Sequence, residues 1–173
     1  MELLLDLNEE FKLGMRRLAS GVSIIATRDE EGPKGFVATS VSSVALEPTP
    51  CLLVCVNRAV SSHDALIRAG VFSVNLLAQP QVDTALSFSS SSKRAERFRK
   101  DRWTSLVTGA PVYSDALASF DCELQDSTVI QTHTILIGRA VAVRRSPQIA
   151  EPLIYYNGSF THGPSCEPIA CAR

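Results

Sequence analysis

Aromatic residues are scarce in this sequence, at 6%, and neither sign of charge dominates. Seventeen Lys and Arg stand against eighteen Asp and Glu, which leaves a net charge of −1. The electrostatic attraction that binds a protein to nucleic acid or to an anionic membrane is therefore missing. Few aromatic rings also argue against a stacking platform for single-stranded nucleic acid. We expect neither nucleic acid nor a membrane among the partners.

Long apolar runs are missing as well, since none approaches the roughly 20 residues of a membrane-spanning helix. Residues 1–10 lack the basic start and long apolar stretch of a signal peptide, so we expect a cytoplasmic protein. The 173 residues, 45% hydrophobic and 20% charged, suit one globular domain with its own core. We assign residues 1–162 to this domain and residues 163–173 to a C-terminal tail.

The cysteines and histidines do not form a metal-binding pattern. The five cysteines include no CxxC pair, and their odd number does not suit a disulfide framework. Cys51 and Cys55 lie in one apolar run where both would face the same side of a strand, and we interpret them as buried reduced thiols. The three histidines, His63, His133 and His162, are dispersed along the chain. We expect no metal site.

Three common catalytic or nucleotide-binding motifs are absent. The sequence has no GxGxxG turn of a dinucleotide-binding fold, no P-loop and no GxSxG nucleophile elbow. A ligand that carries a phosphate would have to be bound by strand hydroxyls, backbone N–H groups and scattered basic side chains.

The apolar periodicity predicts a β-rich α+β fold. Helical spacing is found around residues 11–18, 61–70 and 79–88, and strand-like patterns at 22–27, 36–40, 51–56, 71–77, 118–124, 133–143 and 153–156. Because the connecting turns are short, we expect mostly antiparallel pairing. A closed or split β-barrel fits this order better than a doubly wound sheet.

Residues 35–43 are unusually rich in small hydroxyl side chains. If they form one strand, Thr39 and Ser43 face one side and Ser40 faces the other. Such side chains let a ligand approach the backbone and offer it hydrogen bonds. A solvated strand face explains the same pattern.

Three further groups have two interpretations each. Arg58, Ser61 and Ser62, between a strand and a helix, could bind one anion or form an ordinary helix start. The basic residues between 93 and 102 are interrupted by acidic ones, so they form either a solvated helix face or a set of cations near a small phosphate. His133, inside an apolar strand, is either structural or functional.

Taken in order, these segments resemble the flavin reductase-like family, whose fold is an FMN-binding split β-barrel. The resemblance runs from about residue 11 to residue 160. Its landmarks are ASGVSIIAT (19–27), Gly35, ATSVSSV (38–44), EPTP (47–50), CVNR (55–58) with Ser61 and Ser62, FSVNLL (72–77) with Gln81, Arg97 with Phe98, HTILIGR (133–139) and PLIYYNG (152–158).

Two positions depart from the family pattern. Members often have Gly-Asp before the strand histidine, where this chain has Gln131 and Thr132. Members also often have an arginine after the tyrosine pair, where this chain has Asn157. Both regions face the nicotinamide in such enzymes, so the resemblance does not decide between NADH and NADPH.

The resemblance implies an antiparallel split barrel with a few peripheral helices, working as a homodimer. It assigns the flavin ring and ribityl chain to Ala38, Thr39, Ser40, Ser43, Val56, Asn57 and Arg58. It assigns the phosphate to Ser61 and Ser62, with Arg97 as a further cation, which could also come from the other subunit. His133 would contact the nicotinamide, without being strictly required for hydride transfer, and Tyr156 would pack nearby.

The implied activity is hydride transfer from NADH or NADPH to FMN, with FAD as the other cofactor that the motifs admit. Reduced flavin or its electrons would go to a partner monooxygenase, for example one acting on 4-hydroxyphenylacetate. Two alternatives remain: an FMN-retaining reductase of cob(II)yrinic acid a,c-diamide, a corrinoid, and a flavin-binding module without enzymatic activity. A relative of pyridoxamine-phosphate oxidase is disfavoured, because the landmarks belong to the reductase branch.

Overall fold

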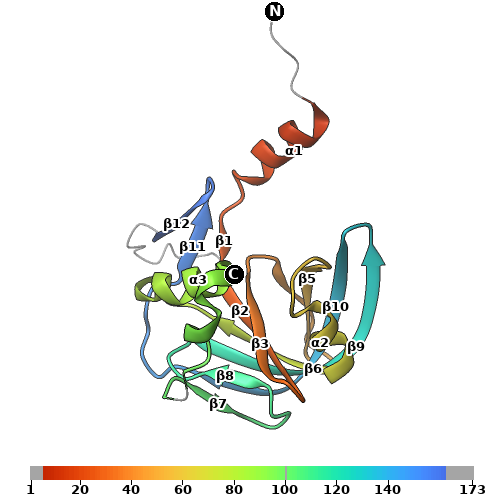
Figure 1. Ribbon diagram of the computed structural model, residues 1–173, viewed down its shortest axis with the longest axis vertical. Helices are drawn as coiled ribbons and strands as arrows, with labels where there is room; N and C mark the ends of the chain where they lie inside the picture. The colour runs from red at the N-terminus through yellow and green to blue at the C-terminus, as the bar shows by residue number, and fades with distance from the viewer. Residues whose placement is uncertain (1–5, 100, 163–173) are drawn as a thin grey trace, which may run out of the picture.

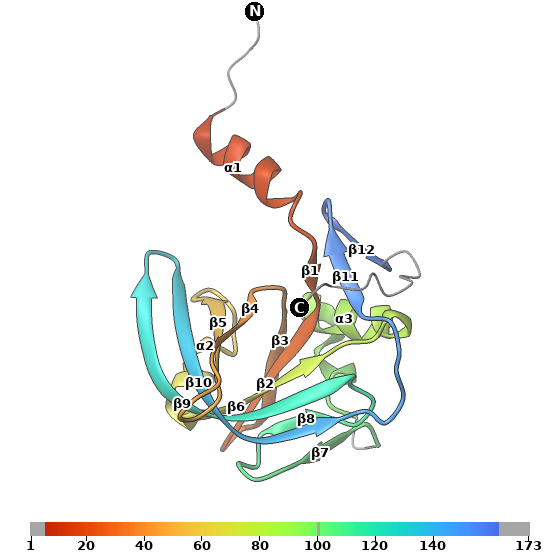
Figure 2. The same cartoon turned by 180° about the vertical axis from the view of Figure 1, so that it is seen from behind.

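A single curved antiparallel sheet forms the body of the computed structural model, which describes residues 6–99 and 101–162 (Figures 1 and 2). Its seven strands are ordered β3-β2-β6-β9-β10-β5-β4. They are β2 (Ser23–Asp29), β3 (Gly32–Ala38), β4 (Val41–Ala45), β5 (Cys51–Asn57), β6 (Val71–Leu76), β9 (Ala118–Ile130) and β10 (His133–Arg145). All pairings between them are antiparallel, as the short turns predict.

The connection between β3 and β4 requires the sheet to curl. These strands end the sheet at opposite edges, yet only Thr39 and Ser40 separate them. Across a flat seven-stranded sheet the edges would lie about 29 Å apart, whereas the step from residue 38 to residue 41 spans at most about 11 Å. The two edges must therefore approach each other, and the Ser40 carbonyl accepts a hydrogen bond from the Cys55 N–H at 3.2 Å. The predicted β-rich split-barrel fold is confirmed.

Smaller elements surround this barrel. The helices are α1 (Leu7–Met15), α2 (His63–Ala69) and α3 (Val82–Ser89), with 3₁₀ turns η1 (Gln79–Gln81) and η2 (Ser91–Glu96). Strands β1 (Ser20–Gly21), β11 (Leu153–Tyr156) and β12 (Ser159–His162) form a second sheet, and β7 (Trp103–Ser105) pairs with β8 (Pro111–Tyr113). Among the described residues, no helix is long and apolar enough to span a membrane.

Strand β2 separates two apolar cores. Ile25 packs inside the barrel with residues such as Phe72 and Leu136. Its neighbour Ile24 faces the opposite side and packs with Phe88 of α3 and with other buried residues. Because successive strand residues point to opposite faces, β2 is buried on both sides. The barrel is thereby joined to the layer formed by α3 and β8.

Two predicted segments differ from the structure. Residues 35–43 do not form one strand, because the chain leaves β3 and enters β4 at Thr39 and Ser40. The first helix spans Leu7–Met15 rather than residues 11–18, and the chain that follows it extends so that Ser20 and Gly21 pair with β11. None of the nine residues of α1, all of which the structure describes, is buried (Figure 1 shows the helix standing away from the barrel). Its apolar spacing therefore does not mark a face of this chain's own core.

The cysteines differ in burial. Cys122 is fully buried, as expected for a structural thiol, but Cys51 and Cys55 are only half-buried, on the less buried face of β5. That correction arises because Leu52 and Val54 occupy the face that points into the core. Cys166 and Cys171 lie outside the described residues.

We expect these thiols to react at different rates. Burial, followed by the charge of nearby Asp121, raises the pKa of the Cys122 thiol to about 12, and only the thiolate is a good nucleophile. Alkylation of the native protein near pH 8, followed by peptide mapping, should leave Cys122 unmodified and modify it once denaturant is added. Equal labelling of Cys122 in both conditions would contradict its burial.

Candidate functional site

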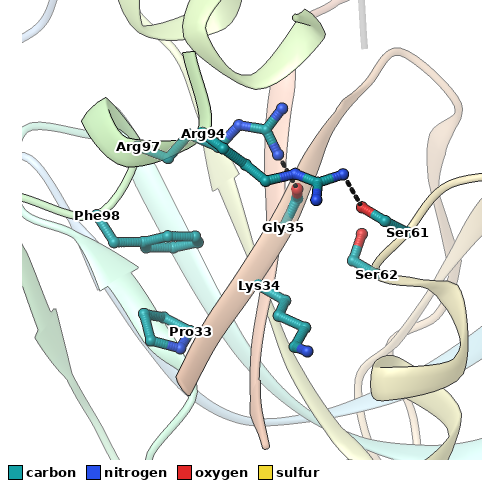
Figure 3. A pocket seen from close by; sticks show the side chains of 8 residues that line it. All are labelled: Pro33, Lys34, Gly35, Ser61, Ser62, Arg94, Arg97 and Phe98. Atoms are coloured by element: carbon teal, nitrogen blue, oxygen red, sulfur yellow. Dashed lines mark hydrogen bonds between the residues drawn. The ribbon is translucent and has the colours of Figure 1, made fainter. Parts of the chain in front are cut away.

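A cavity of about 210 Å³ lies between β3, the turn that leads into α2 and the segment formed by η2 and the residues directly after it (Figure 3). We call it the arginine–serine cavity. The residues that line it are Pro33, Lys34, Gly35, Ser61, Ser62, Arg94, Arg97 and Phe98. It therefore brings together segments that are about thirty residues apart in the sequence, with three cationic side chains and two hydroxyls.

The two serines present their hydroxyls differently. Ser61 Oγ accepts a hydrogen bond from Arg94 Nη2 at 3.0 Å. Ser62 is 2% exposed, and its Oγ has no hydrogen-bond partner among the described residues. A buried hydroxyl without a partner is costly, because it has lost its hydrogen bonds to water. The Ser62 hydroxyl is thus free to bind a polar group inside the cavity.

Arg97 is held in place by three backbone carbonyls. Its Nε donates to Ser87 O at 2.9 Å, its Nη2 to Ser90 O at 2.8 Å and its Nη1 to Gly35 O at 3.3 Å. Burial, followed by the like charge of Arg94, lowers the pKa of the Arg97 guanidinium from its usual value. Two cations this close repel each other, so an anion between them would be stabilising.

Lys34 contributes less charge to the cavity than its position suggests. Its ammonium pairs with Asp29 at 3.3 Å and with Glu31, and the hydrogen bond to Glu31 is the main cause that raises the pKa of Lys34. In Figure 3 this ammonium points away from the two arginines. We therefore regard Arg94 and Arg97 as the principal cations of the site.

An aromatic cluster fixes the segment that carries both arginines. The Phe98 ring packs edge-on against Phe88, with centroids 5.2 Å apart, and lies 4.8 Å from the Trp103 ring. Trp103 Nε1 donates to Arg97 O at 2.9 Å. These contacts explain how a polar, irregular stretch holds two charged side chains over β3.

Gly35 permits the close approach of these elements. A Cβ at this position would lie 2.6 Å from Ile25 O, 3.1 Å from Phe88 and 3.3 Å from Phe98. Because this oxygen belongs to the backbone, it cannot rotate away from the added Cβ, and glycine is the residue that fits here without displacing β2. The same residue's carbonyl accepts the bond from Arg97, and the glycine thus links the barrel to the cavity.

A second, larger cavity of about 730 Å³ lies where β3 gives way to β4. It is lined by residues of α1 and of the stretch after it up to Ser20, together with Thr39, Ser40, Val41, Ser42, Leu53 and Tyr155. Gly35 of the arginine–serine cavity and Thr39 are four residues apart on one edge of the barrel, roughly 13 Å along the chain. The two cavities therefore lie along the same edge of the barrel.

The predicted site residues are distributed over this region. Ser61, Ser62 and Arg97 meet in the arginine–serine cavity, and Arg97 reaches it from the same chain. Thr39 and Ser40 line the larger cavity. The remaining predicted residues of the flavin wall are Ala38 and Val56, which are core residues, Ser43, which lies exposed on β4, and Asn57, which ends β5.

Arg58, His133 and Tyr156 lie elsewhere. Arg58 is exposed in the turn after β5, and the described residues that line the arginine–serine cavity do not include it. His133 is exposed at the start of β10, opposite Asn57. Tyr156 is 40% exposed at the end of β11, and within the described residues it is Tyr155, not Tyr156, that lines the larger cavity.

Arg94 was considered only as one of the basic residues between 93 and 102, and Arg97 alone was assigned to the phosphate. The spacing of three between Arg94 and Arg97 is the one signal that both could face the same side of a helical turn. Among the described residues, no group of three or more His, Cys, Asp or Glu side chains could hold a metal ion. The site thus offers hydroxyls, guanidinium groups and backbone groups to a ligand.

Comparison with known proteins gives one consistent family. Residues 15–164 match the flavin reductase like domain. The chain is 39% identical over 160 residues to "FMN reductase (NADH) RutF" of Pseudomonas syringae pv. syringae (strain B728a), covering 92% of this chain and 89% of the relative. It is 40% identical over 157 residues to the protein of that name in Stutzerimonas stutzeri (strain A1501), covering 91% and 88%.

Solved structures agree with these relatives. The flavin reductase component BorF of a bacterial two-component tryptophan halogenase has a TM-score of 0.82 and 29% identity, covering 92% of this chain and 99% of its own. Nitrilotriacetate monooxygenase component B from Mycobacterium thermoresistibile has a TM-score of 0.86 and 26% identity, covering 95% and 92%.

Proposed function

This chain belongs to the flavin reductase like family, and from that premise we propose that it is an NADH-dependent FMN reductase. The names of its relatives support both the nicotinamide and the flavin. They also favour an enzyme over a flavin-binding module without activity. A preference for NADPH over NADH, or for FAD over FMN, would contradict the proposal.

The observation that carries the proposal is the unpartnered Ser62 hydroxyl beside two arginines. A phosphate monoester offers three strong acceptor oxygens and up to two negative charges. It would accept hydrogen bonds from the serine hydroxyls and offset the repulsion between Arg94 and Arg97. The residues present thus fit the phosphate end of FMN, which riboflavin lacks.

The rest of the site fits a flat polar ring. When bound, FMN supplies the ring that accepts a hydride from reduced nicotinamide. Thr39 and Ser40, between β3 and β4, would offer hydroxyl and backbone groups to that ring. Ser43 and Asn57 would extend the wall, whereas Ala38 and Val56 are buried in the core and support it from behind. A donor placed toward a ring carbonyl stabilises negative charge as it develops there. The protein's task is therefore to bind and orient, and no general base is needed.

We also propose that the active form is a homodimer. Leu7, Phe11 and Leu18 on or just after α1 are 79%, 68% and 59% exposed, which leaves an apolar surface without a partner in one chain. A second copy that covers this surface would also enclose the larger cavity beside Thr39. Sedimentation analysis should give a dimer, and Phe11→Ser should shift it toward monomer, whereas a monomeric wild type would contradict the proposal.

The acceptor of the reduced flavin is proposed to be a partner oxygenase. Its support is that similar structures are components of a two-component halogenase and of a monooxygenase. A corrinoid reductase that retains FMN is the alternative. Protein purified without added flavin should be colourless if it shuttles flavin to a partner, and yellow if it keeps FMN and passes on electrons.

His133→Ala should raise the KM for NADH by about tenfold while changing the dissociation constant of FMN by less than about twofold. The reason is that His133 lies exposed at the start of β10, outside the arginine–serine cavity, where an incoming nicotinamide could contact it. Steady-state kinetics with both substrates varied, together with flavin titration, measures the two effects. Lost flavin binding with unchanged nicotinamide kinetics would show that His133 belongs to the flavin site instead.

The proposed activity is tested by mixing the protein with FMN and NADH in the absence of oxygen. The absorbance of oxidised flavin should disappear with a rate that saturates in NADH, and NADPH should be the poorer donor. Persistence of the flavin band over the whole observation, with flavin shown to be bound, would favour the module without enzymatic activity.

A further inference from the structure

His63 joins two elements that are far apart in the sequence. It is the first residue of α2, and its side chain is only 12% exposed. Its Nδ1 lies 2.8 Å from Asp64 Oδ1, and its Nε2 lies 2.9 Å from Thr134 Oγ1 on β10. Both ring nitrogens are therefore engaged, and the ring links the start of α2 to a strand seventy-one residues further along the chain.

The chemistry of the partners determines the roles of the two nitrogens. The hydrogen bond with His63 is the largest cause that lowers the pKa of Asp64, so this carboxylate is ionised and can only accept. Nδ1 must then carry a hydrogen and donate it. Nε2 shares the second hydrogen bond with Thr134 Oγ1, a hydroxyl that can donate or accept. The imidazole therefore links the threonine hydroxyl to the carboxylate.

Thr134 is a rigid anchor for this arrangement. It is 2% exposed, and its strand pairs on both sides, with Val56 of β5 and Val129 of β9. His63, in contrast, directly follows Ser61 and Ser62 in the turn that leads into α2. The imidazole thus links the turn that carries Ser61 and Ser62 to strand β10, inside the sheet.

We propose that His63 is a positioning residue, which holds the Ser61 and Ser62 hydroxyls in the arginine–serine cavity through its bond to Thr134. This inference rests on the proposed function, because the hydroxyls are taken to bind the phosphate of FMN. The pair His63 and Thr134 touches the sheet and the helix start rather than the cavity itself, since neither is among the described residues that line it. Its effect is therefore exerted through the serines, and it selects for flavin that carries a phosphate.

The test compares Thr134→Val with Thr134→Ser, using FMN and riboflavin as the two probes. Valine keeps the branched shape but removes the hydroxyl, whereas serine keeps the hydroxyl. We expect Thr134→Val to weaken FMN binding about tenfold and riboflavin binding less than about twofold, with Thr134→Ser close to wild type. His63→Ala should reproduce the effect of Thr134→Val, which provides a second variant if valine at residue 134 prevents folding.

A purely structural role predicts a different result. Thr134→Val and His63→Ala would then lower the melting temperature and leave the ratio of FMN to riboflavin affinity at its wild-type value, which would overturn the inference. Equal affinity of the wild-type protein for FMN and riboflavin would instead contradict the proposal that the arginine–serine cavity binds the phosphate. Failure of this inference would therefore be seen in the variants, whereas failure of the proposed function would be seen in the wild-type protein.

Discussion

Arg94→Ala should raise the dissociation constant for FMN by roughly 10- to 100-fold and change that for riboflavin by less than about twofold. Arg94 lines the arginine–serine cavity and already donates to Ser61. Removing its guanidinium deletes a charge-assisted hydrogen bond to the phosphate and also frees the Ser61 hydroxyl. Because riboflavin has no phosphate, it makes no hydrogen bond of this kind with Arg94 or Ser61. Quenching of flavin fluorescence on binding measures both constants.

Arg99→Ala is the matched control for this variant. Arg99 lies in the same basic run, but it is exposed, pairs with Asp101 at 3.8 Å and is absent from the described lining of the cavity. Its removal changes the net charge by the same amount and should leave both dissociation constants near their wild-type values. If Arg99→Ala weakens FMN as much as Arg94→Ala does, the effect is one of overall charge and the cavity is not the phosphate site.

Gly35→Ala should lower the free energy of unfolding by roughly 1–3 kcal/mol and weaken FMN binding as well. The added methyl group would lie 2.6 Å from Ile25 O, which is backbone and cannot rotate away. To relieve this contact, β2 and β3 must separate. Phe88 and Phe98 would also meet the methyl group, and their movement would displace Arg97 from the Gly35 carbonyl. Denaturant titration measures the first effect and flavin titration the second.

Gly21→Ala controls for the general cost of alanine at a glycine in a strand. A Cβ at Gly21 would meet nothing within 4 Å, so we expect the unfolding free energy to stay within about 0.5 kcal/mol of wild type. A stable Gly35→Ala protein with unchanged flavin affinity would show that β3 and the arginine segment can separate without affecting the site.

Much of the fold could be predicted from the sequence, because strand alternation and short turns report local geometry. The antiparallel strands, the hairpin of β2 and β3 and the left-handed Gly70 that ends α2 at φ 64° all follow from such local signals. The break between β3 and β4 does not. The hydroxyl-rich run of residues 39–43 continues across the break into β4 without a turn signal, and only the curling of the whole sheet decides that the chain must change edges at Thr39.

The candidate site could be predicted only in part, for the same reason. Ser61 and Ser62 became candidates because small hydroxyls before a helix are a local pattern, and the family resemblance then assigned the phosphate to them. Arg94 was not singled out from the basic run because its place in the cavity depends on aromatic contacts between Phe98, Trp103 and α3, which the run does not reveal. The apolar spacing around residues 11–18 predicted the helix α1 but not what covers its apolar side chains, since the spacing is the same whether the partner is the chain itself or another molecule.

The most direct test of the account is a crystal structure of the protein with FMN. We predict that the phosphate lies in the arginine–serine cavity, within hydrogen-bond distance of Ser62 Oγ and the Arg94 guanidinium, and that the ring lies beside Thr39 and Ser40. A bound flavin whose phosphate lies outside this cavity, with Ser62 still unpartnered, would contradict it.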